Sequence, residues 1–227
     1  MPEINSLTLK TDANIKAYYR FESGARLTDS STNAKTLTNV GTPTYAVSKF
    51  GDGLDVKATA NYVYYNGDIG LTGDGSASVS MWVKLNNEIG AGTYSFCQHE
   101  INTGTTRYFT FYYNYNAGTR QIQLAASGTD LYYTVTLGTA NWHHFVIVRT
   151  TTTNIKVYLD NVEVISNTPG TGASGAALFR IGSNGASHSD AKIDDVAVFD
   201  RVLTPAEIST IYNEAVSSGS SGMFLAF

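Results

Sequence analysis

The chain has 227 residues, of which 42% are hydrophobic and 15% are charged, with a formal net charge of −4 at pH 7. This length suits one all-β domain, and the apolar and aromatic content argues against disorder. The charge balance offers no basic surface for nucleic acid, and no apolar run is long enough to span a membrane. Cys97 is the only cysteine, which excludes an internal disulfide and predicts a small buried thiol.

The predicted elements are mostly short strands separated by turns rich in Gly, Asn, Asp and Ser. In chain order, we expect strands at residues 15–21, 54–56, 62–65, 78–85, 94–99, 107–115, 120–126, 131–137, 142–149, 154–159, 162–165 and 178–181. Residues 28–42 are expected to form a loop, and Asp160-Asn161 a two-residue hairpin turn. About a dozen such strands predict an all-β fold, a jelly-roll sandwich of two antiparallel sheets.

Residues 191–215 predict a final strand, a turn and a short helix. In the strand, alternation places Ile193 and Asp195 on one face and Asp194 and Val196 on the other. Because both faces carry apolar residues, we expect this strand to be covered on both sides and to lie centrally in a sheet.

The predicted helix begins after Thr204, which is a favourable N-cap residue. Pro205 suits the first helical position, and Glu207 completes a capping box with Thr204. One face of the helix is apolar and is formed by Ile208, Ile211, Tyr212 and Ala215. An isolated helix of about three turns is marginal in water, so we expect this face to dock on a sheet.

Several motifs accompany this strand-turn-helix ending. They are Ala-Tyr-Tyr-Arg-Phe-Glu-Ser at 17–23, Asp-Ser-Ser at 29–31, Lys-Phe-Gly-Asp-Gly-Leu-Asp-Val at 49–56, Ser-Val-Ser-Met-Trp-Val-Lys at 78–84, Asn-Trp-His-His-Phe at 141–145 and Lys-Val-Tyr-Leu-Asp-Asn at 156–161. Together they resemble laminin G-like domains of the concanavalin A-like type, over residues 15–215. The resemblance implies one jelly-roll domain at 1–215, and a function among glycan binders, protein binders and enzyme appendages.

Residues 107–115 are rich in aromatic side chains. Phe109, Phe111, Tyr113 and Tyr115 share one face, which is the better candidate for the core. The predicted ligand-binding residues lie on or near the opposite face, and they are Arg107, Tyr108, Tyr112 and Asn114. An exposed Tyr stacks on a sugar ring while Asn and Arg bind hydroxyl groups. There are two alternatives to sugar binding for the outward-facing tyrosines. They either simply fit the pleated surface of the sheet or serve a protein interface.

The resemblance also implies one structural Ca²⁺ at the sandwich edge, held by a loop after the first strand and a carboxylate near the end of the domain. The implied ligands are Asp29, Asn33 and either Asp194 or Asp195, whose oxygens suit calcium. Since Asp194 and Asp195 are expected on opposite faces, only one of them can point at a given site. The alternative is that Asp29 forms a turn and one Asp of the pair caps a loop.

No catalytic constellation stands out, so we predict that the protein is not an enzyme. The Glu-x-Asp-x-x-Glu pattern of retaining glucanases on this fold is absent, and Asp160 and Glu163 straddle a predicted turn. His143 and His144 are adjacent in a predicted strand and point opposite ways, so they cannot chelate one metal. One of these two histidines is expected to pack in the core.

Residues 216–227 form a separate segment, in which a Ser/Gly linker precedes the large apolar residues Met223, Phe224, Leu225 and Phe227. This tail either folds back onto its own sheet or is donated to a neighbouring subunit, which would give a homo-oligomer.

Two functions follow from these patterns. The first is a surface adhesion module whose partner is a glycan. The alternative is a structural virion protein, such as a phage capsid decoration or tail component, whose tail binds neighbouring protein subunits. The start of the chain lacks the features of a secretory signal, which favours the second function. The expected location is extracellular or on a virion surface.

Overall fold

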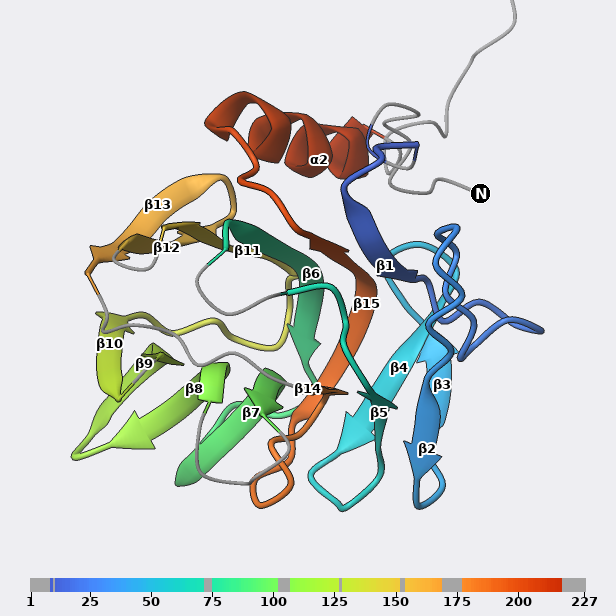
Figure 1. Ribbon diagram of the computed structural model, residues 1–227. Coiled ribbons are helices and arrows are strands. Elements are labelled where there is room, and N and C mark those ends of the chain that lie inside the picture. The colour runs from blue at the N-terminus through green and yellow to red at the C-terminus, as the bar shows by residue number, and fades with distance from the viewer. Residues whose placement is uncertain are drawn as a thin grey trace, which may run out of the picture.

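The computed structural model describes residues 9, 11–71, 75–101, 107–126, 128–151, 154–168 and 177–217. The described chain forms two antiparallel sheets packed face to face, with one helix against the outer side of the upper sheet (Figure 1). This arrangement confirms the predicted sandwich. Among the described residues, no helix combines the length and apolar character needed to cross a bilayer.

The eight-stranded sheet is called sheet A. Its strands run in the order β13 (Val162–Asn167), β12 (Asn154–Leu159), β11 (His143–Thr151), β6 (Ala77–Leu85), β15 (Asp190–Phe199), β4 (Asp52–Lys57) and β3 (Thr44–Val47), and β1 (Ile15–Tyr19) also pairs with β15. The final strand, β15, lies between β4 and β6, as its two apolar faces predicted.

The seven-stranded sheet is called sheet B. Its order is β10 (Thr129–Thr134), β9 (Thr119–Ala126), β8 (Arg107–Asn116), β7 (Gly92–Ile101), β14 (Ala177–Ile181), β5 (Tyr62–Asn66) and β2 (Thr38–Val40). Strand β2 falls inside the predicted loop 28–42, so that prediction was wrong at this point. The strand is only three residues long and pairs with the edge of β5, which local sequence does not reveal.

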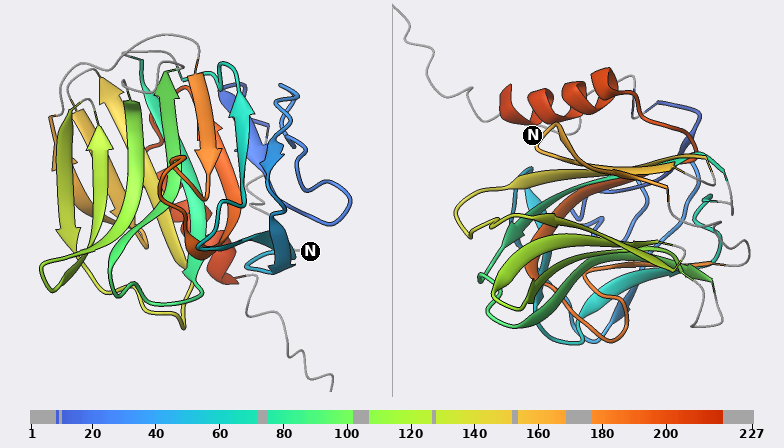
Figure 2. Two further views of the ribbon diagram at one scale, coloured as in Figure 1. Left: turned by 90° about the horizontal axis from the view of Figure 1, so that it is seen from below. Right: turned by 90° about the vertical axis from the view of Figure 1, so that its left-hand side faces the viewer.

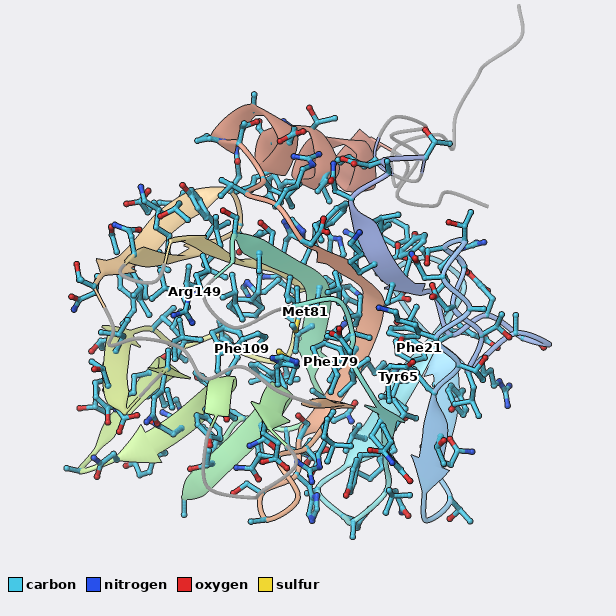
Figure 3. The ribbon with its side chains drawn as sticks, viewed as in Figure 1. Phe21, Tyr65, Met81, Phe109, Arg149 and Phe179 are labelled. Atoms are coloured by element: carbon cyan, nitrogen blue, oxygen red, sulfur yellow. The ribbon has the colours of Figure 1, made fainter. Side chains whose placement is uncertain are left out.

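One hydrophobic core fills the space between the sheets. Met81 from sheet A and Phe109 and Phe179 from sheet B all lie in this space (Figure 3). The ring of Phe145 in β11 lies 5.1 Å from Phe111 and 5.9 Å from Phe96, measured between centroids. Aromatic contacts across the sandwich therefore join the two sheets into one packed unit.

Helix α2 (Pro205–Ser217) begins with the predicted capping box. The Thr204 N–H donates to Glu207 Oε2 at 2.7 Å, and the Glu207 N–H donates to Thr204 Oγ1 at 3.3 Å. Ile208 and Ile211 are buried against Tyr18 and other residues on the outer face of sheet A. The helix therefore covers that face (Figure 2, right), as its apolar side predicted.

A β-bulge in β15 overturns the predicted faces of this strand. The register against β6 shifts between Asp194 and Ala197, and Asp195 has a φ of 47°. Ile193 and Val196 consequently both pack in the core between the sheets, whereas simple alternation put them on opposite faces. One extra residue in a strand inverts the side-chain alternation that follows it, which the sequence pattern did not show.

Candidate functional site

The outer face of sheet B is the broad sheet surface that α2 does not cover. Figure 2 (left) looks onto this face, where strands β10 to β5 lie side by side and a loop between β14 and β15 passes in front of them. Sheet A, by contrast, buries its outer face beneath α2. A ligand has access to the sandwich on the side of sheet B.

Strand β8 shows how the sequence divides the two faces of sheet B. Phe109, Phe111 and Tyr113 pack in the core, as predicted. Tyr112 and Asn114 alternate with them and therefore lie on the outer face. The side chains of Arg107 and Tyr108 lie outside the described residues, although their backbone belongs to β8.

Cross-strand pairing gathers polar side chains into a row on this outer face. Tyr112 in β8 pairs with Gln123 in β9, and Gln123 pairs with Tyr132 in β10. Asp130 lies one row away, on the same face as Tyr132 and opposite Ala125. Because Ala125 has a small side chain, it leaves space between the longer side chains around it.

This space is a hollow of about 250 Å³, lined by Thr93, Tyr112, Gln123, Ala125, Asp130, Asn184 and Ser187. Its size lies just below the range of roughly 300–1,000 Å³ that is typical of pockets for drug-sized ligands. The hollow therefore suits a small polar unit, and six of its seven lining residues carry a hydroxyl, amide or carboxylate group.

Hydrogen bonds hold these lining residues in place. Asn114 Nδ2 donates to Gln123 Oε1 at 2.5 Å, and Gln123 Nε2 donates to the Tyr132 hydroxyl at 3.4 Å. The same hydroxyl donates to Asp130 Oδ2 at 3.4 Å. Within the described part of the chain, Oδ1 of the buried Asn114 has no hydrogen-bond donor.

The loop between β14 and β15 closes one side of the hollow. Asn184 Oδ1 accepts from the N–H groups of Ala186 and Ser187, at 3.0 and 2.6 Å, and Asn184 Nδ2 donates to the Tyr112 hydroxyl at 3.0 Å. Ser183 and His188 pair across the loop. The loop covers Tyr112, which is only 6% exposed, so its ring does not offer a free stacking face.

Tyr132 provides the exposed aromatic surface instead. It is 50% exposed and its hydroxyl contacts both Gln123 and Asp130. Sequence reasoning identified Tyr112 and Asn114 but missed Gln123, Asp130, Asn184 and Ser187. The alternation of β9 and β10 was a usable signal for Gln123 and Asp130, whereas the two loop residues reach the site only through long-range packing.

The predicted calcium ligands Asp29 and Asn33 make backbone contacts near the start of the domain. Asp29 Oδ1 accepts from the N–H groups of Tyr18 and Ser31, at 2.9 and 2.8 Å, and Oδ2 accepts from the Lys35 N–H at 3.0 Å. Asn33 Nδ2 donates to the Ile15 carbonyl at 2.8 Å. These bonds fasten the loop after β1 to the strand, as expected for a turn-forming Asp.

Asp194 and Asp195 both find partners on the outer side of sheet A, because the bulge removes their alternation. Asp194 Oδ2 accepts from the Phe50 N–H at 2.9 Å, and the Tyr18 hydroxyl donates to Asp195 Oδ1 at 2.8 Å. Burial, together with the neighbouring Asp195 carboxylate, raises the pKa of Asp194 well above its usual value. With exposed fractions of 0% and 1%, the pair is out of reach of a substrate.

Tyr18 lies between the predicted calcium ligands, since its N–H binds Asp29 and its hydroxyl binds Asp195. The carboxylates therefore meet opposite ends of one tyrosine and do not converge on a point. Nowhere in the described ranges do three His, Cys, Asp or Glu side chains gather closely enough to hold a metal. These contacts do not form a recognisable calcium site, and calcium binding stays a prediction.

The histidine and turn predictions are confirmed. His143 Nδ1 lies 2.7 Å from Asp160 Oδ2, whereas His144 points the other way, is fully buried and lies 2.8 Å from Ser80 Oγ. Asp160 and Asn161 both have positive φ, as a tight hairpin turn requires.

Asp160 and Glu163, which straddle this turn, have different partners. Asp160 binds His143, whereas Glu163 contacts Lys156 and Tyr158. Cys97 is buried, and burial raises the pKa of its thiol.

The comparison with solved structures shows the same fold in carbohydrate-related proteins. Domain 4 of an extracellular arabinanase from Geobacillus stearothermophilus, solved in complex with arabinotriose, superposes with a TM-score of 0.67 at 23% identity, covering 88% of this chain and 98% of that domain. The binding domain of botulinum neurotoxin DC in complex with SialylT gives 0.68 at 12% identity, and Trypanosoma rangeli sialidase gives 0.67 at 13%.

The coverage of the last two differs from that of the arabinanase domain. This chain spans 52% of the toxin binding domain and 32% of the sialidase, with 88–89% of its own length aligned. At these identities the likeness concerns the fold alone. No curated protein matches the chain in a sequence search.

A family model matches residues 57–209, which is more than half of the chain, and its description is the concanavalin A-like lectin/glucanase superfamily. The matched region includes the strands that form the hollow and the buried Trp82 and His144. The chain is therefore a laminin G-like member of the concanavalin A-like lectin/glucanase superfamily.

Proposed function

We propose that this domain is a non-enzymatic, extracellular glycan-binding module that uses the outer face of sheet B. The observation that carries the proposal is the hollow of hydroxyl, amide and carboxylate groups beside the half-exposed ring of Tyr132. Such groups bind sugar hydroxyls, and an exposed aromatic ring packs against the apolar face of a sugar. The complexes of the structural neighbours with arabinotriose and SialylT support a role of this kind.

The carboxyl groups at the hollow favour binding over catalysis. Among the described residues that line it, Asp130 is the only carboxylate, whereas glycoside hydrolysis uses a pair of carboxyl groups on either side of the scissile bond. The apolar tail at 223–227, on which the alternative of a structural virion protein rests, lies outside the described residues. That alternative and the tail-mediated oligomer stay predictions.

The test is glycan binding by the Tyr132→Ala variant. Loss of the exposed ring should weaken binding about tenfold, corresponding to ~1.4 kcal/mol. The glycan is first selected on an array and its affinity is then measured by titration calorimetry.

Tyr133→Ala is the matched control, since Tyr133 is the next residue in β10, is 38% exposed and pairs with the core residue Ile122 on the other face. It should bind like the unmodified protein. Equal affinities of both variants and the unmodified domain would place binding elsewhere, and no binding to any glycan would overturn the proposed function.

A further inference from the structure

The charge of the hollow bears on which glycans it accepts. Of the described residues that line it, Asp130 is the only one with an ionisable carboxylate, and none is Lys, Arg or His. The undescribed segments at 72–74, 102–106, 127, 152–153 and 169–176 also contain no Lys, Arg or His, and the undescribed Lys10 follows Leu9, which packs on the opposite side of the sandwich, against the outer face of sheet A. Their sequences therefore bring no cation to the hollow.

Two arginines of sheet B, Arg180 and Arg120, are already paired. Arg180 in β14 donates through Nη1 to Gln98 Oε1 at 2.6 Å and also to Glu100, a carboxylate that is 8% exposed. Arg120 in β9 donates to the Ile89 carbonyl at 3.0 Å, and its Nε lies 3.2 Å from Glu88 Oε1. The backbone of Arg107 in β8 lies opposite Glu100 in β7. This position is beyond the Thr110–Ala125 pair that borders the hollow.

The polar groups that line the hollow match an uncharged sugar. The exposed Asp130 carboxylate, which already accepts from the Tyr132 hydroxyl, has further lone pairs for the hydroxyl groups of a sugar. Asn184, Ser187 and Thr93 supply further amide and hydroxyl groups. A ligand carboxylate placed here would meet a like charge and, among the described lining residues, no cation, which is unfavourable at short range.

We propose that the hollow selects neutral sugar residues and rejects those carrying a carboxylate, such as sialic or uronic acids, and that Asp130 is the residue that sets this preference. The inference rests on the proposed function and specifies its ligand class. It sets this domain apart in ligand chemistry from a sialylated-glycan binder with the same fold.

The experiment uses neutral probes beside acidic counterparts: lactose with 3′-sialyllactose, and arabinotriose with trigalacturonate. Affinities are measured for the whole chain at low and high salt. We expect each neutral probe that binds to do so at least tenfold more tightly than its acidic counterpart, with a smaller ratio at high salt because salt screens the repulsion. Asp130→Lys should reduce the ratio at least tenfold, and Asp130→Asn should reduce it less.

Glu163→Gln is the control for net charge, because Glu163 lies on β13 in sheet A and contacts Lys156. It should keep the full preference. An acidic probe that binds as tightly as its neutral counterpart, with binding lost in Tyr132→Ala, would overturn the inference and leave the proposed function standing. No binding to any of these probes or to any glycan on the array would overturn both.

Discussion

His144 is a buried imidazole held between sheet A and α2. Its ring stacks on Trp82 with centroids 4.8 Å apart, and it is fully buried. Burial lowers the pKa of His144 to about 3, and burial likewise lowers the pKa of His99 to about 4. Since the unfolded chain takes up these protons near pH 6.5 and the folded chain does not, stability should fall as the pH falls below about 6.5.

The expected size for one such histidine is up to about 1.4 kcal/mol per pH unit. Urea unfolding at pH 6 and pH 4.5 measures it, with His144→Gln beside the unmodified protein. The variant should lose less stability between these two pH values. His143 affects stability at a higher pH than His144 does. Burial alone would lower the pKa of His143, but its contact with Asp160 outweighs burial and raises it. Identical pH slopes, or NMR titration of the His144 ring near pH 6, would contradict this assignment.

At the scale of single elements, α2 depends on its cap as well as on docking. Thr204 and Glu207 exchange two hydrogen bonds at the first turn, so Thr204→Ala should lower the free energy of unfolding by about 1 kcal/mol. Thr210 is exposed within the same helix, and its hydroxyl donates to the Ala206 carbonyl. Thr210→Ala should be near neutral because Ala is the better helix former. Equal losses in both variants, in urea titrations, would argue against the capping role.

At the scale of the whole molecule, the two sheets share one core and should unfold together. Phe145 in sheet A packs on Phe96 and Phe111 in sheet B, so Phe145→Ala should cost about 3–5 kcal/mol. Tryptophan fluorescence reports on the α2 side of sheet A, because Trp82 and Trp142 pack in one cluster with Tyr212 of α2. Far-UV circular dichroism reports on all strands. In urea the two signals should change at one midpoint, in the variant as in the unmodified protein. Separate midpoints would show that the sheets are independent.

The sequence by itself determined the features that depend on near neighbours in the chain. Alternation assigned the two faces of β8, the capping box marked the start of α2, and Asp160-Asn161 marked a tight turn, because each pattern involves residues a few positions apart. Only the tertiary structure decided on which face of β15 the side chains of Asp194 and Asp195 lie, since the bulge at Asp195 depends on pairing with β6. The hollow could also be found only from the tertiary structure. Its lining residues are brought together by cross-strand register and by the packing of Asn184 on Tyr112, which lie 72 positions apart in the chain.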